Sequence, residues 1–104
     1  MSSPSPKTLL LRLGLRPKKT LGQHFLLHPH QARRIVAALN LTGADTVVEI
    51  GAGLGALTGW LAAAAHRVIA LELDPELARL LREELLVETP GVEVICQDVL
   101  TFDF

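Results

Sequence analysis

The sequence predicts an α/β fold, the N-terminal half of a doubly wound parallel sheet. Short apolar runs typical of buried strands alternate with segments whose apolar residues recur at helical spacing. A glycine-rich turn follows the first of these runs, and acidic residues follow the next two. Because parallel strands need crossover connections, this order favours a βαβαβ unit whose strands lie side by side.

The alternating unit begins after a turn at residues 42–45. Its expected strands are Thr46–Ile50, Arg67–Leu71 and Val92–Cys96. One connecting helix is expected over 56–65, and a second after Asp74, which suits an N-cap before Pro75. The residues expected on the buried faces of these helices are Leu57, Trp60, Leu61 and Ala64 in the first, and Leu77, Leu80, Leu81 and Leu85 in the second.

Two further helices are expected upstream of this unit. Pro29 suits the first position of a helix whose buried face would carry Ala32, Ile35, Val36 and Leu39. Ser5 can cap a shorter helix, with Pro6 in its first turn, that Leu9–Leu13 makes apolar and Gly14 ends.

The chain has the size of one small domain, with 104 residues of which 49% are apolar. Cys96 is the single cysteine and cannot form an internal disulfide, so we expect a small core residue in a reducing, cytoplasmic setting. The longest stretch without a charge or a histidine, Ile50–Ala65, is too short for a membrane span and contains four glycines. We therefore expect a soluble protein without a membrane segment.

The charge of the chain divides sharply before Asp45. Residues 1–44 carry seven lysines and arginines and no acid, whereas the remainder carries three bases and eleven acids. Clustered bases gain affinity for phosphates by releasing counterions, so the basic part suits a nucleic-acid backbone. A solvated basic arm or a serine-containing mitochondrial transit peptide fits the same composition. We divide the chain into a basic N-terminal helix and arm, residues 1–28, and the first part of the sheet domain, residues 29–104.

In doubly wound sheets the ligand lies beyond the carboxyl ends of the strands. Gly51 and Gly53 follow the first strand, where they let the backbone turn tightly and approach a ligand. The helix that follows favours an anionic group at its N-terminus. Glu72 follows the second strand and is placed to accept hydrogen bonds from both hydroxyls of a ribose. Asp98 follows the third strand and is placed to accept a hydrogen bond from the exocyclic amine of an adenine.

Two classes of adenosine-containing cofactor fit this loop. Gly51, Gly53 and Ala56 can be read as G-x-G-x-x-A, the pattern of NAD(P)-dependent oxidoreductases, with Glu72 as the ribose ligand. However, a carboxylate at Glu49 would repel a doubly anionic pyrophosphate. S-adenosylmethionine carries a sulfonium, an ammonium and one carboxylate, so acids around the loop attract it. Alternatively, the acids are only helix caps or solvated strand ends. This alternative explains poorly why three acids follow or lie at the ends of three consecutive strands.

Four segments of the chain form a recognisable set: Lys18–Leu26, Val48–Thr58, Ala70–Asp74 and Gln97–Val99. Together they resemble the ribosomal RNA adenine N6,N6-dimethyltransferase family, which has a Rossmann-like S-adenosylmethionine-dependent methyltransferase fold. The most specific part is the Gly-Gln-His-Phe-Leu stretch, because glycine-rich loops are common and this block is not. In the family the equivalent block closes over the cofactor. The resemblance therefore implies cofactor contacts from His24 and Leu26, together with Gly51, Glu72 and Asp98.

The resemblance implies N6-dimethylation of adenines in small-subunit, 16S-type ribosomal RNA during ribosome biogenesis, with the immature small subunit as partner. In this mechanism the target adenine leaves its stack and its N6 attacks the activated methyl in line. Family members carry an Asn-[Leu/Ile]-Pro-[Tyr/Phe] block that accepts hydrogen bonds from this amine.

That catalytic block has no counterpart in the sequence. The one asparagine, Asn40, precedes Leu-Thr, and there is no tyrosine. We expect the block to lie beyond Phe104, the last residue of the chain. The sequence is therefore interpreted as an N-terminal fragment that binds cofactor and is inactive alone, without a catalytic residue or a metal, and monomeric.

Several alternatives stay open at this point. Large-subunit adenine methyltransferases and mitochondrial transcription factors are relatives with the same fold, although the Lys-Lys-Thr-Leu-Gly-Gln opening at residues 18–23 looks more like the small-subunit enzymes. A nicotinamide-dinucleotide oxidoreductase and a module that binds without catalysis belong to different functional classes.

Overall fold

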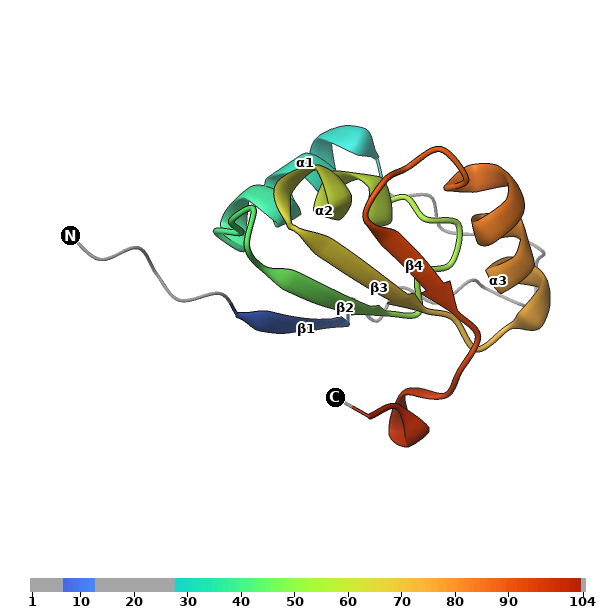
Figure 1. Cartoon of the computed structure of the whole chain (residues 1–104). Helices are drawn as coiled ribbons and strands as arrows, with labels where there is room; N and C mark the ends of the chain where they lie inside the picture. The colour runs from blue at the N-terminus through green and yellow to red at the C-terminus, as the bar shows by residue number, and fades with distance from the viewer. Residues whose placement is uncertain (1–6, 13–27, 104) are drawn as a thin grey trace.

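A computed structural model describes residues 7–12 and 28–103. Its centre is a parallel sheet with the strand order β1-β2-β3-β4. The strands are β1 (Thr8–Arg12), β2 (Thr46–Ile50), β3 (Arg67–Leu71) and β4 (Val92–Ile95), and the α-helices are α1 (Pro29–Ala38), α2 (Thr58–Ala64) and α3 (Pro75–Leu80). Because successive strands are added in one direction, right-handed crossovers place these helices on one face of the sheet (Figure 1). The α/β fold expected from the sequence is confirmed.

The elements around β2 and β3 follow the sequence pattern closely. Both strands have the predicted bounds, and β4 ends one residue earlier than expected. Helix α1 begins at Pro29 and is capped by His28, whose Nδ1 accepts a hydrogen bond from the amide of His30 at 3.1 Å. Asp74 caps α3 as predicted, by accepting a hydrogen bond from the amide of Glu76 at 2.9 Å. These local signals fix the helix starts.

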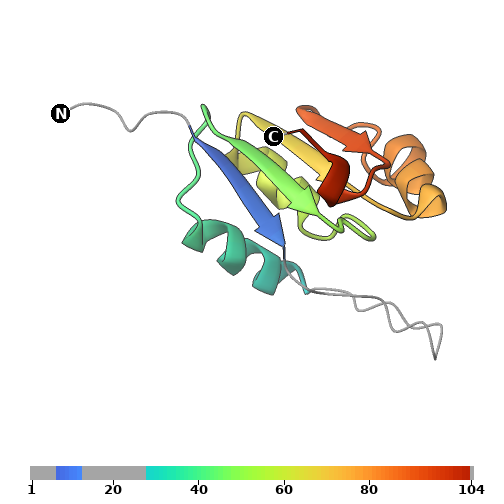
Figure 2. The same cartoon turned by 90° about the horizontal axis from the view of Figure 1, so that it is seen from below.

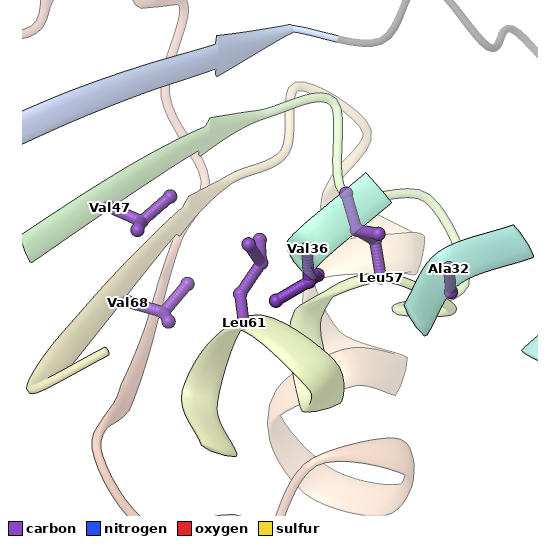
Figure 3. Close-up of a cluster of buried hydrophobic side chains, with 6 residues drawn as sticks. All are labelled: Ala32, Val36, Val47, Leu57, Leu61 and Val68. Carbon is purple, nitrogen blue, oxygen red and sulfur yellow. The ribbon is translucent and has the colours of Figure 1, made fainter. Parts of the chain in front are cut away.

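The main core lies between the sheet and the first two helices. Side chains from α1, β2, the start of α2 and β3 point toward one another in this space, as Figure 3 shows; they are Ala32, Val36, Val47, Leu57, Leu61 and Val68. A second cluster beneath α3 is formed by Ala52, Ala70, Ala78, Leu81, Leu86 and Val94. Replacing a fully buried leucine such as Leu61 with alanine would cost about 2–5 kcal/mol.

A change of helix type shifts the buried face at the end of α3. The helix continues as a π-helix, η2 (Leu81–Leu85), in which the amide of Leu86 donates to the carbonyl of Leu81 at 2.8 Å. The extra residue per turn rotates the following side chains. As a result Leu86 is buried and Leu85 is 47% exposed. The expectation that Leu85 belongs to the buried stripe is therefore wrong.

The N-terminal apolar run is a strand, which corrects the helix expected over Leu9–Leu13. The described part forms β1, which pairs in parallel with β2. Leu9 and Leu11 alternate toward the main core, whereas Leu10 is 52% exposed. Five residues are too few to distinguish helical from strand periodicity, and the edge of β2 supplies hydrogen bonds that a short helix would not have. The expected cap, first-turn proline and terminating glycine of that helix lie outside the described residues.

Asp45 fastens β1 to the rest of the sheet. Its side chain accepts hydrogen bonds from the backbone amide and the ammonium group of Lys7, at 3.0 and 2.7 Å, and from the amide of Thr42 at 2.8 Å. These interactions, the Lys7 contact first, hold the pKa of the Asp45 carboxyl well below its usual range. The sequence pattern places this residue in a turn and does not otherwise single it out.

Two expected core residues lie at the surface. Trp60 is 38% exposed, because Thr58 and Leu61, three residues apart, form the buried face of α2 and Trp60 lies to one side of that face. Cys96 is exposed because β4 ends before it, and its thiol faces the carbonyl of Leu73 at 3.7 Å. Within residues 7–12 and 28–103, no helix is long and apolar enough to cross a membrane.

Candidate functional site

The carboxyl ends of the strands converge at one edge of the sheet. All four strands are parallel, so their ends lie on the same side, as the arrowheads in Figure 2 show. The backbone pairing continues just past the strands: the amide of Gly51 donates to the carbonyl of Leu71 at 2.8 Å, and the amide of Glu72 donates to the carbonyl of Ile95 at 3.0 Å. This pairing brings the glycine loop and the acid of the next strand to one edge.

The glycine loop, residues 51–57, has an open side and a packed side. At Gly51 φ is +73°, and an added Cβ would meet no atom of the described residues within 4 Å. At Gly55 φ is +78°, and an added Cβ would lie 2.9 Å from Cδ2 of Leu81. Both conformations favour glycine. The loop thus leans on η2 at Gly55 and leaves room for a ligand at Gly51.

Glu72 connects the glycine loop to the end of β3. The residue is 7% exposed, and its Oε1 accepts a hydrogen bond from the amide of Gly53 at 2.8 Å. Its Oε2 accepts from the amide of Asp74 at 3.0 Å. A carboxylate oxygen can accept more than one hydrogen bond, so Glu72 retains capacity for further donors. It places a negative charge directly beside the loop.

Glu49 is buried beneath the same loop. It is 4% exposed, and its Oε1 accepts a hydrogen bond at 2.5 Å from the hydroxyl of Thr58, which is fully buried. Burial raises the pKa of the Glu49 carboxyl to about 7, against the lowering effect of the Thr58 hydrogen bond and with a further raising effect from the charge of Glu72. From the sequence, Glu49 is expected to be an ionised carboxylate lining the loop. The structure corrects this, because the group is sequestered and only part ionised at neutral pH.

Asp98 lies past the end of β4 and is exposed. It caps the short 3₁₀ helix η3 (Val99–Thr101), because its Oδ1 accepts a hydrogen bond from the amide of Leu100 at 2.9 Å. The neighbouring Gln97 donates to the carbonyl of Thr101 at 2.9 Å, which holds this turn together. The carboxylate can accept further donors while it caps the turn.

The structure assembles most of the predicted cofactor residues. Gly51, Gly53 and Glu72 lie together, with Asp98 following the adjacent strand. Sequence reasoning missed Thr58, although a hydroxyl residue at the start of the helix after a glycine loop is a visible signal. Among the residues that the structure describes, no group of three or more His, Cys, Asp or Glu side chains could hold a metal ion.

Two predicted cofactor contacts fall on residues that the structure does not describe. His24 and Leu26, expected to contact the cofactor, lie outside the described residues. Phe104 also lies outside the described residues, which end at residue 103. The catalytic block is expected beyond Phe104. The contacts of His24 and Leu26 and the position of that block therefore stay predictions.

Comparison with known proteins identifies the family. A family model described as ribosomal RNA adenine dimethylase matches residues 14–104. The chain belongs to this family. The match includes the glycine loop and both acids at the strand ends, and it confirms the resemblance that the sequence motifs predicted.

Two relatives illustrate how much of a family member the chain represents. The ribosomal RNA small subunit methyltransferase A of Thermotoga maritima is 50% identical over 91 residues, which cover 88% of this chain and 32% of the relative. The protein of the same name from Moorella thermoacetica is 47% identical over 96 residues, with 92% and 33% covered. The chain thus spans about a third of the length of the curated relatives it matches.

Solved structures agree with the fold. The 23S rRNA methyltransferase ErmE is similar with a TM-score of 0.71 and 39% identity, over 77% of this chain and 32% of that chain. A dimethyladenosine transferase from Plasmodium falciparum is similar with a TM-score of 0.68 and 29% identity, over 78% and 30%. The fold is therefore the Rossmann-like methyltransferase fold.

Proposed function

We propose that this chain forms the S-adenosylmethionine-binding part of an enzyme that dimethylates N6 of adenines in small-subunit ribosomal RNA. Family membership and the names of the relatives support the reaction and the RNA. The observation that carries the cofactor assignment is the buried carboxylate of Glu72, held 2.8 Å from the amide of Gly53. A negative group at this place suits a cationic nucleoside.

The chemistry of the site matches the polar groups of S-adenosylmethionine. Its ribose hydroxyls and adenine amine are donors, and Glu72 and Asp98 are acceptors at adjacent strand ends. The open side of Gly51 leaves space for the backbone to approach the ligand. We assign His24 and Leu26 to contacts that close over the cofactor, on the family resemblance alone. When bound, S-adenosylmethionine supplies an electrophilic methyl group.

A dinucleotide fits this loop less well. In a dinucleotide site, the amides of the glycine turn donate to the pyrophosphate. Here the amide of Gly53 already donates to Glu72, so a phosphate at this position would have to displace a carboxylate and lie beside its charge. The repulsion comes from Glu72 and does not need Glu49 to be ionised.

The basic N-terminal part would bind the phosphates of the RNA. Within the described residues, Arg33 and Arg34 are exposed on α1, a helix that carries no acidic residue. We propose that the N-terminal part, residues 1–28, supplies the segment that closes over the cofactor and, with α1, contacts phosphates, although its residues Thr8–Arg12 belong to the sheet as β1. Residues 29–104 form the rest of this first part of the catalytic domain. We further propose that the chain alone binds cofactor without transferring a methyl group, because it contains no Asn-x-Pro-aromatic block up to Phe104.

Calorimetry would test the cofactor assignment. We expect the 104-residue chain to bind S-adenosylmethionine and S-adenosylhomocysteine and to ignore NAD. Binding of NAD in preference to S-adenosylmethionine would overturn the proposal. A methyl-transfer assay with tritiated cofactor and immature small subunits should give no transfer by the chain alone, and measurable transfer would refute the proposed inactivity.

Filter binding would test the RNA assignment. We expect the chain to bind a fragment of small-subunit ribosomal RNA with an affinity that falls as salt increases, since phosphate contacts release counterions. Replacing Arg33 and Arg34 with glutamate should weaken this binding. The same replacement of Arg79 in α3 and Arg82 in η2 provides the comparison. Because Arg79 pairs with Glu83 and Arg82 donates to the carbonyl of Val94, the melting temperature of this variant is measured as well. An equal loss of RNA binding in a folded Arg79 and Arg82 variant would argue against a specific role for α1.

A further inference from the structure

The buried pair of Glu49 and Thr58 lies outside the set of side chains that would touch the cofactor. Glu49 is the penultimate residue of β2, and Thr58 is the first residue of α2. Their hydrogen bond therefore spans the whole glycine loop and ties its two ends together.

The sheet neighbours of Glu49 in the described structure are apolar. In the sheet, Glu49 lies between Leu11 of β1 and Ala70 of β3. Helix α2, with the sequence TGWLAAA, carries no titratable side chain. Among the residues that the structure describes, the one charged neighbour that acts on Glu49 is Glu72, at the end of β3. A carboxyl group buried in this way costs free energy that an apolar residue of similar size would avoid. We therefore expect Glu49 to have a role in positioning the glycine loop.

The loop is fixed at two further points. Glu72 holds the amide of Gly53, and the side chains of Leu81 and Leu86 pack against the position of Gly55. Two acids on neighbouring strands thus act on one loop, Glu72 at its open side and Glu49 at its base. If the base opened, Gly53 would move relative to Glu72, and both groups belong to the proposed cofactor site.

We propose that Glu49 and Thr58 form a positioning pair that sets the shape of the glycine loop for the cofactor, although neither side chain touches the cofactor. This inference rests on the proposed function, because it assigns the pair a part in binding S-adenosylmethionine. The Thr58 hydroxyl can donate to a carboxylate or accept from a carboxylic acid, so the pair persists in both protonation states of Glu49.

Four variants of the 104-residue chain separate positioning from mere stability. Thr58→Val removes the hydroxyl while keeping the shape of the side chain. Thr58→Ser and Glu49→Gln keep a hydrogen bond across the base of the loop and serve as the conservative rescues. Val36→Ala opens a small cavity in the main core, on α1 and away from the loop, and serves as the control for general destabilisation.

Two measurements are made on each variant: the dissociation constant of S-adenosylmethionine, and the hydrogen-exchange protection of the Gly53 amide by NMR. For Thr58→Val we expect the cofactor to bind about tenfold more weakly and Gly53 to lose about tenfold in protection, the factor that corresponds to one typical hydrogen bond. Thr58→Ser and Glu49→Gln should stay within about threefold of the parent. Val36→Ala should lower the melting temperature and leave both readouts at the parental level.

The outcomes distinguish this inference from the proposed function. If the parent chain fails to bind S-adenosylmethionine, the proposed function is refuted, and with it the part of this inference that concerns the cofactor. Parental binding and Gly53 protection in Thr58→Val would refute the positioning role while leaving the proposed function intact. Equal losses of cofactor affinity and of Gly53 protection in Thr58→Val and Val36→Ala would also refute the positioning role. They would show that the pair acts only by stabilising the fold.

Discussion

Oε1 of Glu72 accepts a hydrogen bond from the amide of Gly53 at 2.8 Å, which joins the end of β3 to the loop that follows β2. Replacing Glu72 with glutamine keeps the size of the side chain but removes its charge and one acceptor. We expect S-adenosylmethionine to bind about tenfold to a hundredfold more weakly, because hydrogen bonds to a charged group are lost. Calorimetry measures the effect.

The matched control for this change is Glu76→Gln. Glu76 is an exposed acid in the first turn of α3, close in sequence to Glu72 but outside the loop. Its replacement should leave the affinity unchanged. Similar losses in the two variants would mean that the overall negative charge, and not the placement of Glu72, attracts the cofactor.

Gly55 and Gly59 should respond in opposite ways to alanine. At Gly55 the backbone has φ +78°, and an added Cβ would lie 2.9 Å from Leu81, so we expect Gly55→Ala to cost about 1–3 kcal/mol. Gly59 lies within α2, and no atom of the described part of the chain lies within 4 Å of its Cβ position, so Gly59→Ala should be neutral or stabilise by up to about 1 kcal/mol. Urea unfolding compares them. A stable Gly55→Ala variant would show that the loop does not need this conformation.

The parts of the fold that the sequence predicts are those with strong local signals. The strands β2 and β3 are continuous apolar runs bounded by turns, and Asp74-Pro75 marks the start of α3 on its own. The failures depend on distant contacts. Only tertiary packing could reveal the π-helix that exposes Leu85 and buries Leu86. Likewise, the pairing of β1 with β2 depends on an edge that lies far away in sequence.

The site shows the same division between local and distant information. The sequence predicts that Gly51, Gly53 and Glu72 lie close together because strand ends meet at one edge of a parallel sheet, and the structure brings these residues together. The state of Glu49 could not be predicted, since its pKa depends on burial and on the hydroxyl of Thr58, which only the folded loop brings near.

Asp45 should be the residue that keeps β1 in the sheet. In the usual doubly wound order the fourth strand lies beside the first, and β1 here occupies that side of β2. Asp45→Ala leaves the partly buried amides of Lys7 and Thr42 without their acceptor, so we expect a loss of about 2–4 kcal/mol. Hydrogen exchange should show that β1 loses protection while the pairing of β2 with β3 persists.

Lys7→Met provides the comparison for Asp45. It removes the half-exposed ammonium group but keeps the backbone amide that Asp45 accepts, so we expect a loss below about 1 kcal/mol. Because the pKa of Asp45 is held low, its stabilising contribution is present near neutral pH and is lost as the pH falls below the ordinary value of 3.8. If Lys7→Met lowers the free energy of unfolding as much as Asp45→Ala does, the stabilisation comes from the ion pair and not from the hydrogen bonds to the backbone amides.

Glu49 should make the stability of the chain fall as the pH rises toward neutrality. Its pKa is raised from the ordinary 4.5 to about 7, so between these values the folded chain holds a proton that the unfolded chain has lost. The contribution is fully present below pH 4.5, decreases up to about pH 7 and is constant above, with a total of about 3 kcal/mol. Glu49→Gln removes this term, and histidine contributions cancel in the comparison. Urea unfolding between about pH 5 and 8 should therefore give the variant a growing advantage over the parent, whereas parallel pH profiles would show that Glu49 is ionised throughout.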